Sequence, residues 1–403
     1  MLYFYLLSSI VLYCLFIRFR TLNITLNILI FFSFLFCNFF SLSTFSCFFY
    51  CIFNLEFAEI LCYDFGIELK KIWFVTDCKE KVKFCLTDRY NDVNVVLKEM
   101  GTFLKEDMEM KFDVVIGNPP YQKANDDSSF TNLWADFVHK SFSISARYVI
   151  MITPKTWGNQ VTKENNSSKV FNLIKKYARD VNIDECSKYF PNIGSSFSYY
   201  LLDKQNQHKK CSIVTTSDKF ETKLSDITFI PKDFNLTTMN ILRKMLDREM
   251  FSYLSSSGTI GNISNVKTKH QIYSVRYSMG TEKWSDKPHA YQLKPKLIFP
   301  NQTTQNYPIY APTSAPANRG VFYLVKNKME ALKILSYIKS KPIQFLIAQQ
   351  RTHHGVLNTQ VIKHIPKIDI SKNWNDKKLY QYFKLTNKEI DYIEAITGDS
   401  HVQ

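Results

Sequence analysis

The sequence predicts an α/β protein with a mostly parallel sheet, helices on both faces of the sheet, and a smaller α+β domain after it. Short apolar runs alternate with helical patterns from about residue 56 to residue 204, which is typical of βαβ units. Beyond Lys204, short strand-like runs and helices follow in irregular order. A chain of 403 residues has room for two or three domains.

The elements of the first domain are predicted from the spacing of apolar residues. Helices are expected at 57–69, 78–90, 130–142 and 167–178. Strands are expected at 70–77, 93–100, 111–117, 146–157 and 196–204. In a parallel sheet with helices on both faces, such strands are buried on both sides.

Residues 1–54 differ from the rest of the chain, because Arg18 and Arg20 are their only charged residues. By length and polarity the segment would be able to span a membrane. Alternatively, it is a wrong-frame translation, since Phe, Leu, Ser, Cys and Ile are what T-rich DNA encodes. With the first reading the protein is membrane-associated; otherwise we expect it in the cytoplasm.

The cysteines predict neither a metal site nor a disulfide framework. The chain has nine cysteines but no C-x-x-C pair, a pattern that suits a reducing compartment. His353 and His354 are adjacent in the sequence, and neighbouring side chains point apart on most backbones. We therefore expect no metal.

Positive charge is concentrated in one part of the chain. Residues 251–367 contain 16 lysines and arginines against three acids, a net charge of +13 out of +15 for the whole chain. Together with aromatic and amide side chains, such an excess is typical of a nucleic-acid-binding surface. The candidate DNA-binding residues are Lys294, Lys296, Arg319, Lys326, Lys328 and Arg351.

The stretch KFDVVIGNPPYQ (Lys111–Gln122) places two prolines directly after a predicted buried strand. Proline donates no hydrogen bond and restricts the residue before it, so the pair ends the strand in a rigid loop. The carbonyl groups of Asn118 and Pro119 can each accept one hydrogen of a planar amino group, which leaves its nitrogen more nucleophilic. Tyr121 adds an aromatic face on which a base can stack. The loop suits methyl transfer to the amino group of a flipped nucleobase.

These residues resemble the adenine-specific DNA methyltransferases of restriction-modification systems. The resemblance extends from about Glu56 to the end of the chain. It rests on FDVVIGNPPYQ, NLWADFV, YVIMITPKTW, FPNIGSSFSYYLLDK and IPKIDISKNWNDKKLYQYFKLTNKEIDYIE. It implies a Rossmann-like core that uses S-adenosylmethionine, a smaller α+β target-recognition domain, and double-stranded DNA as the partner.

The resemblance also implies roles for single residues. Asn118, Pro119, Pro120 and Tyr121 match the catalytic loop, and Asn118 also borders the cofactor. Phe197 is the candidate for a second aromatic contact to the flipped base. The cofactor contacts implied elsewhere are Asp77 on the ribose and Thr102 with Phe103 beside the adenine.

Two departures from the family pattern affect the cofactor site. Thr102 stands where the family usually has an acid. No glycine precedes Gly66, although the family's cofactor loop between the first strand and the first helix is glycine-rich. We therefore expect a catalytic domain without its first strand and glycine loop, inactive as written. The alternatives are a catalytically dead DNA-binding remnant and a membrane-anchored protein.

The predicted organisation has four parts. A hydrophobic segment spans 1–55, the catalytic domain 56–205, the basic target-recognition domain 206–370, and a helical tail 371–403. Thr386 and Glu389 in the tail have the spacing of a helix-capping box.

Overall fold

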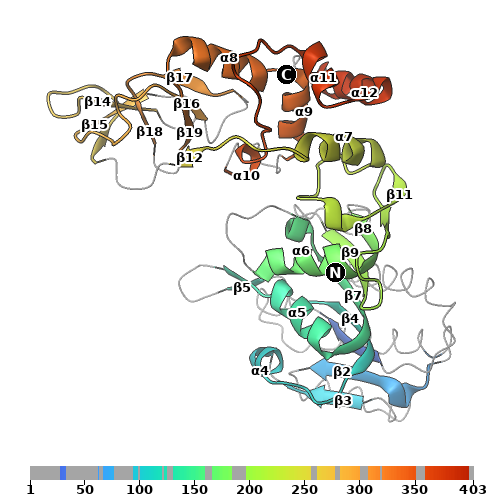
Figure 1. Ribbon diagram of the computed structural model, residues 1–403. Helices are drawn as coiled ribbons and strands as arrows, with labels where there is room; N and C mark the ends of the chain where they lie inside the picture. The colour runs from blue at the N-terminus through green and yellow to red at the C-terminus, as the bar shows by residue number, and fades with distance from the viewer. Residues whose placement is uncertain are drawn as a thin grey trace. The chain divides into compact units, whose positions relative to one another are not determined.

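The computed structural model forms two compact units, with the boundary between Asp226 and Ile227. Figure 1 shows both units as ribbons. The structure describes residues 28–32, 62, 67–76, 94–98, 100–119, 122–124, 130–158, 166–183, 197–255, 261–276, 282–299, 307–317, 320–350 and 359–398.

The N-terminal unit is built around one nine-stranded sheet. From edge to edge its strands are β11 (Lys219–Thr222), β10 (Cys211–Val214), β8 (Ala178–Ile183), β9 (Phe197–Asp203), β7 (Ser145–Pro154), β4 (Phe112–Asn118), β1 (Ile28–Phe32), β2 (Ile72–Thr76) and β3 (Asn94–Leu97). Strands β1, β2, β3, β4 and β7 are all parallel. β9 lies antiparallel between β7 and β8. The mostly parallel sheet predicted from the sequence is confirmed.

The place between β2 and β4 is filled by β1, from the hydrophobic segment. Ile28 pairs with Ile72 on one side and with Val114 on the other, and Phe32 pairs with Asn118. The expectation that the domain lacks its first strand is wrong. The apolar run Ile28–Phe32 suits a strand that has neighbours on both sides.

Two helices of the N-terminal unit pack against its sheet: α5 (Trp134–Ile144) and α6 (Asn166–Tyr177). α5 contacts β4 and β7, and α6 contacts β8 and β9.

The predicted helix at 130–142 begins later than expected, because Phe130–Asn132 forms β6 and pairs with β5 (Gln122–Ala124). Of the helix expected at 57–69, the structure describes only Cys62 and residues 67–69, and a short 3-10 turn spans Leu69–Lys71. The helix expected at 78–90 lies outside the described residues. The unit also contains α4 (Met100–Lys105) and 3-10 turns at Lys155–Gly158 and Leu224–Asp226.

The N-terminal unit continues past residue 205, where we expected the catalytic domain to end. β10 pairs parallel with β8, and β11 pairs antiparallel with β10. Alternate side chains of both strands are buried. The hairpin therefore extends the sheet, and the boundary between the units moves to Asp226.

The C-terminal unit contains two four-stranded sheets and six helices among its described residues. One sheet has the order β12 (Leu254–Ser255), β19 (Val321–Leu324), β16 (Lys296–Phe299) and β17 (Ile309–Ala311). The other has the order β13 (Ile263–Ser264), β15 (Glu282–Ser285), β14 (Tyr273–Arg276) and β18 (Ala315–Pro316). The helices are α7 (Leu236–Leu246), α8 (Lys328–Ile338), α9 (Lys341–Gln349), α10 (Thr359–Ile362) and the pair α11 (Asp376–Tyr382) and α12 (Asn387–Gly398).

The last two helices belong to the core of the C-terminal unit and do not form a separate tail. Leu379 and Ile393 are fully buried in the same cluster as Ile241 of α7. The predicted capping box of α12 is confirmed: the Thr386 amide donates to Glu389 Oε2 at 2.7 Å. The same Oε2 accepts from Lys244 Nζ at 2.6 Å, which connects α12 to α7.

In the described part of the chain, no helix is long and apolar enough to cross a membrane. Residues 1–27 and 33–54 lie outside that part, so the membrane reading stays a prediction for them, whereas Ile28–Phe32 lies in the sheet of the N-terminal unit.

We predict that Ile393→Ala lowers the free energy of unfolding of the C-terminal unit by about 2–4 kcal/mol, because it leaves a cavity in the core. Urea denaturation followed by fluorescence measures the change. Lys388→Ala, at an exposed position of the same helix, is the control and should shift stability by less than about 0.5 kcal/mol. A cost for Ile393→Ala as small as that of the control would show that the last helices are dispensable for folding.

Candidate active site

Asn118 is the last residue of β4, in the middle of the parallel sheet. It lies opposite Phe32 of β1, and the preceding Gly117 pairs with Met151 of β7. Pro119 follows and is buried; because proline has no amide hydrogen, the ladder cannot continue through it. The half-buried Asn118 therefore lies at the carboxyl edge of the sheet, where ligands of open α/β sheets bind. Pro120 and Tyr121 lie outside the described residues.

The carboxyl end of β7 and the beginning of β9 meet at the same edge. Pro154, the last residue of β7, pairs with Phe197, the first residue of β9. β7 is the direct neighbour of β4, so the structure brings Asn118 and Phe197 to one edge of the sheet. The Phe197 side chain is buried, and its contact to a flipped base stays a prediction.

A buried polar cluster supports this edge, and sequence reasoning assigned it no role. Trp157 Nε1 donates to Ser198 Oγ at 2.6 Å, and Thr153 Oγ1 donates to the Tyr200 hydroxyl oxygen at 3.5 Å. Burial raises the pKa of Tyr200 above its usual range, so the hydroxyl stays protonated. The Trp157 ring also packs against Phe171 of α6, with centroids 5.8 Å apart. The signal in the sequence was the tryptophan of TPKTW, which ends the predicted strand 146–157 three residues after Pro154.

The candidate cofactor residues follow the neighbouring parallel strands. Asp77 comes directly after β2 and lies outside the described residues. Thr102 and Phe103 lie in α4, the helix after β3. The almost completely buried Phe103 ring stacks on Phe137 of α5, with centroids 6.1 Å apart. Its described contact is thus to the helix layer, and its contact to a cofactor stays a prediction.

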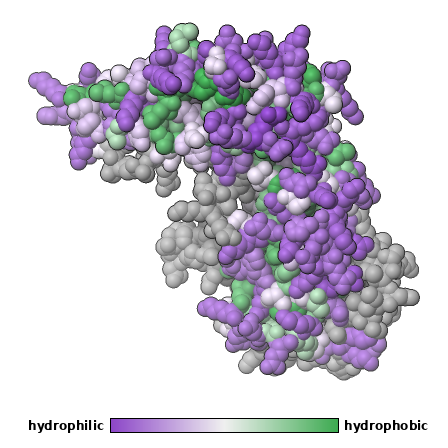
Figure 2. All heavy atoms as spheres, in the orientation of Figure 1, coloured by the Kyte–Doolittle hydropathy of each residue, from purple (hydrophilic) through white to green (hydrophobic). Residues whose placement is uncertain are grey.

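Three of the candidate DNA-binding lysines are exposed and lie close to one end of the β16–β19 pair. Lys294 precedes β16, whereas Lys326 and Lys328 follow β19. The two strands are antiparallel, and the Val325 amide donates to the Pro295 carbonyl at 3.0 Å. Lys294 and Lys326 therefore leave the sheet at the same end. On the face shown in Figure 2, hydrophilic residues predominate among the coloured, described residues. Arg319 and Arg351 lie outside the described residues.

Lys296, in contrast, is fully buried at 0% exposure. Its ammonium donates to the carbonyl oxygens of Ser314 at 2.8 Å and Ala311 at 3.4 Å. The role predicted for Lys296 on DNA is contradicted by this burial, because the charge faces the protein interior. Desolvation lowers the pKa of Lys296 to about 8.

Residues 44–190, which include β4 and the Asn118 loop, match the Eco57I restriction-modification methylase family. This part of the chain is similar to that family. The resemblance predicted from Asn-Pro-Pro-Tyr and its flanking segments is confirmed for this part of the chain, and the sheet is the Rossmann-like core expected for it. The match begins inside the hydrophobic segment that we expected to lie outside the methylase domain.

Similar proteins are known in bacteria. The chain is 25% identical to an uncharacterized adenine-specific methylase of Mycoplasma pneumoniae over 251 residues. This alignment covers 55% of this chain and 57% of that protein. The chain thus spans less than two thirds of that relative. The type IIG restriction endonuclease BpuSI has a TM-score of 0.42 and 9% identity, over 94% of this chain and 60% of that one. A putative class I S-adenosylmethionine-dependent methyltransferase of Listeria monocytogenes has a TM-score of 0.36 and 12% identity, over 52% of this chain and 65% of that one.

The buried Lys296 predicts a pH dependence of stability. Its pKa is lowered in the folded protein, from 10.5 to about 8, so between these values the unfolded chain binds more protons than the folded one. The free energy of unfolding should therefore rise with pH in this window. Relative to Lys296→Met, the parent should gain roughly 1 kcal/mol per pH unit between pH 8 and pH 10.

Denaturation curves of both proteins across this range give the measurement. Because tyrosines and other lysines titrate in both proteins, their effects cancel in the difference. A difference that does not change with pH would show that the Lys296 ammonium is not desolvated.

Proposed function

We propose that the protein is a site-specific, adenine-specific DNA methyltransferase. On this proposal it transfers a methyl group from S-adenosylmethionine to the exocyclic amino group of an adenine flipped out of duplex DNA. The observation that carries the proposal is the position of Asn118-Pro119 at the carboxyl edge of the sheet, within the residues that match the methylase family. The similarity to an adenine-specific methylase supports adenine as the base.

The chemistry on the DNA side needs acceptors, not a strong base. The side-chain carbonyl of Asn118 and the backbone carbonyl of Pro119 can each accept one hydrogen of the adenine amino group. Held in this way, the amino nitrogen no longer shares its lone pair fully with the ring, and it becomes nucleophilic. The proton can leave after the attack. Since Pro119 is buried and fixed in backbone geometry, the two acceptors are held in place before the base arrives.

The residues expected at the cofactor site match the family pattern less well than those of the catalytic loop do. S-adenosylmethionine supplies the methyl group when bound, and in the family a glycine-rich turn after the first strand lets the backbone approach it. In this chain β1 ends at Phe32, and the next glycine is Gly66. Thr102 takes the place of an acid beside the cofactor. The residues present thus supply the sheet and the acceptors for adenine, but not the usual cofactor turn.

DNA recognition is assigned to the C-terminal unit. The exposed lysines 294, 326 and 328 lie in the basic part of the sequence, and phosphate contacts by such side chains position a protein on duplex DNA. An inactive DNA-binding remnant is the second candidate, because the missing glycine turn affects the cofactor and leaves the C-terminal unit unchanged.

We predict that Asn118→Ala abolishes methyl transfer while DNA affinity stays nearly unchanged, because the lost acceptor acts mainly in the transition state. The assay measures N6-methyladenine in DNA at millimolar S-adenosylmethionine, for the chain and for a version with a glycine-rich turn in place of residues 33–56. Asn172→Ala, at an exposed position of α6, is the control. If Asn118→Ala kept activity within about tenfold of the parent, or about 1.4 kcal/mol in the barrier, the assignment of Asn118 would fail.

We also predict that the chain as written binds S-adenosylmethionine no better than millimolar. The version with the glycine-rich turn should bind at micromolar concentration, a gain of about 4 kcal/mol. Isothermal calorimetry on both proteins measures the affinities. Micromolar binding by the unchanged chain would show that residues 33–65 form a cofactor turn without glycine.

A further inference from the structure

Among the large hydrophobic side chains that the structure describes, Leu293 is the most exposed, at 79%. Single exposed leucines are common on protein surfaces, so exposure alone assigns no role. Leu293 differs in two respects: the turn that carries it is bound to the fold on both sides, and the charged groups beside it are arranged for an anionic partner.

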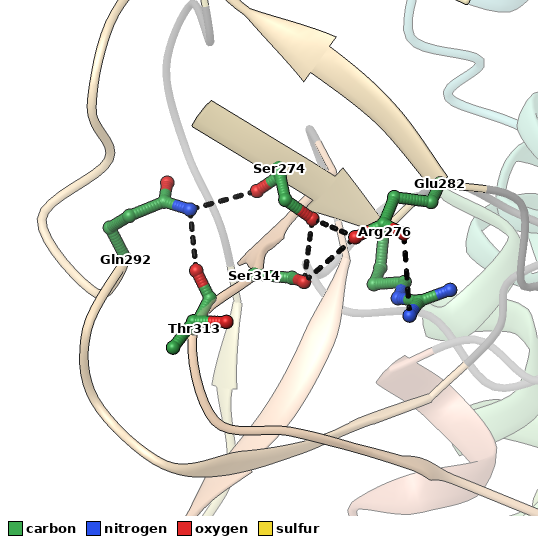
Figure 3. Close-up of polar contacts among 6 residues, drawn as sticks. All are labelled: Ser274, Arg276, Glu282, Gln292, Thr313 and Ser314. Carbon is green, nitrogen blue, oxygen red and sulfur yellow. Dashed lines mark hydrogen bonds and ion pairs between the residues drawn. The ribbon is translucent and has the colours of Figure 1, made fainter. Parts of the chain in front are cut away.

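The residue before Leu293 fixes the turn. Gln292 is 8% exposed, and its Nε2 donates to the carbonyl oxygens of Ser274 at 2.9 Å and Thr313 at 2.6 Å. Figure 3 shows this amide between the two segments. The Gln292 backbone amide also donates to the His289 carbonyl at 2.8 Å. The backbone at Leu293 therefore cannot fold inward to bury the leucine without breaking these bonds.

Further contacts hold the two ends of the turn. The Tyr291 ring packs against Phe322 of β19, with centroids 5.0 Å apart. After the leucine, the Pro295 carbonyl accepts from the Val325 amide at 3.0 Å. Leu293 thus lies on a short, rigid projection beside the β16–β19 pair.

The acids near the turn are engaged within the protein. Glu282 Oε2 lies 3.8 Å from Arg276 Nη2, and the Ser274 hydroxyl donates to the other oxygen of this carboxylate (Figure 3). Asp286 accepts from both the backbone amide and the side-chain amide of Asn262, at 2.8 Å and 2.9 Å. These carboxylates are therefore held by protein donors.

The cations beside the turn are exposed. Lys294 follows Leu293 directly, and Lys326 lies at the same end of the β16–β19 pair. A second leucine, Leu324, is 44% exposed at that end. The result is an apolar projection flanked by lysines.

We propose that Leu293 enters the base stack of duplex DNA as an apolar wedge, while Lys294 and Lys326 bind the phosphates beside it. This rests on the proposed function, and it names the contact by which the C-terminal unit deforms its DNA. Apolar side chains that insert between base pairs kink the duplex and allow wider contact with the protein. An apolar protein partner would instead bury the lysine charges without counter-charges.

The test separates the apolar contact from the charged one by its salt dependence. Binding of the full chain to a mixed-sequence duplex is measured by fluorescence anisotropy over a range of salt concentrations. Leu293→Ala should weaken binding about tenfold at every salt concentration, about 1.4 kcal/mol, with an unchanged slope, because no phosphate contact is lost. Lys294→Ala should reduce the slope of log K against log salt by about 0.9.

Two further variants serve as controls. Leu332→Ala, at an exposed leucine on α8, should bind like the parent, and Leu293→Met should keep most of the affinity because methionine can fill the same gap. In a duplex with 2-aminopurine along its length, the parent should raise the fluorescence by unstacking, and Leu293→Ala should raise it less.

The outcomes are distinct for the wedge and for the proposed function. If the parent binds duplex DNA and Leu293→Ala binds equally well at all salt concentrations, the wedge is excluded and the proposed function stands. If Leu293→Ala instead loses self-association in gel filtration with unchanged DNA affinity, the leucine contacts a second copy of the chain, and the wedge is again excluded. If the parent binds no duplex DNA even at low salt, both proposals fail.

Discussion

Val114, Val115 and Ile116 in β4 are fully buried, with β1 on one side and β7 on the other, and this burial constrains where polar chemistry can lie. A polar side chain within such a strand would be desolvated without a partner. After the half-buried Asp113 near its start, β4 has no further polar side chain until Asn118 at its carboxyl end. Pro119 stops the ladder there, so the acceptor groups lie at the edge of the sheet and not in its interior.

The same rule explains the polar cluster around Trp157. β7 extends beyond the end of β4 and pairs with the beginning of β9, so polar groups at this edge are covered by protein. Each needs a partner, and the bonds from Trp157 to Ser198 and from Thr153 to Tyr200 provide them. The edge that carries Asn118 is therefore supported by a rigid neighbour.

Much of the N-terminal unit could be predicted because its strands and helices are marked by local apolar patterns. β4, β7, β9 and α6 lie close to their predicted ranges. β1 was missed because we expected a glycine loop to mark it, whereas its position depends on pairing with strands far away in the sequence. In the C-terminal unit, the charge of residues 251–367 could be counted, but which lysines are exposed could not. Lys294 and Lys296 are two residues apart, yet Lys294 is exposed in the turn before β16 and Lys296 is buried in the strand, where all four residues are buried.

The bond between Lys244 and Glu389 joins residues 145 positions apart, and this separation has a consequence for synthesis on the ribosome. The N-terminal unit has all its strands once the chain has emerged to Asp226, and domains generally fold as units in the order in which they are made. The core of the C-terminal unit lacks α11 and α12, including the buried Ile393, until the chain has been translated past these helices. During that interval α7 and α9 lack the cover that α11 and α12 provide, so a ribosome that stalls late would release a folded N-terminal unit joined to an aggregation-prone remainder.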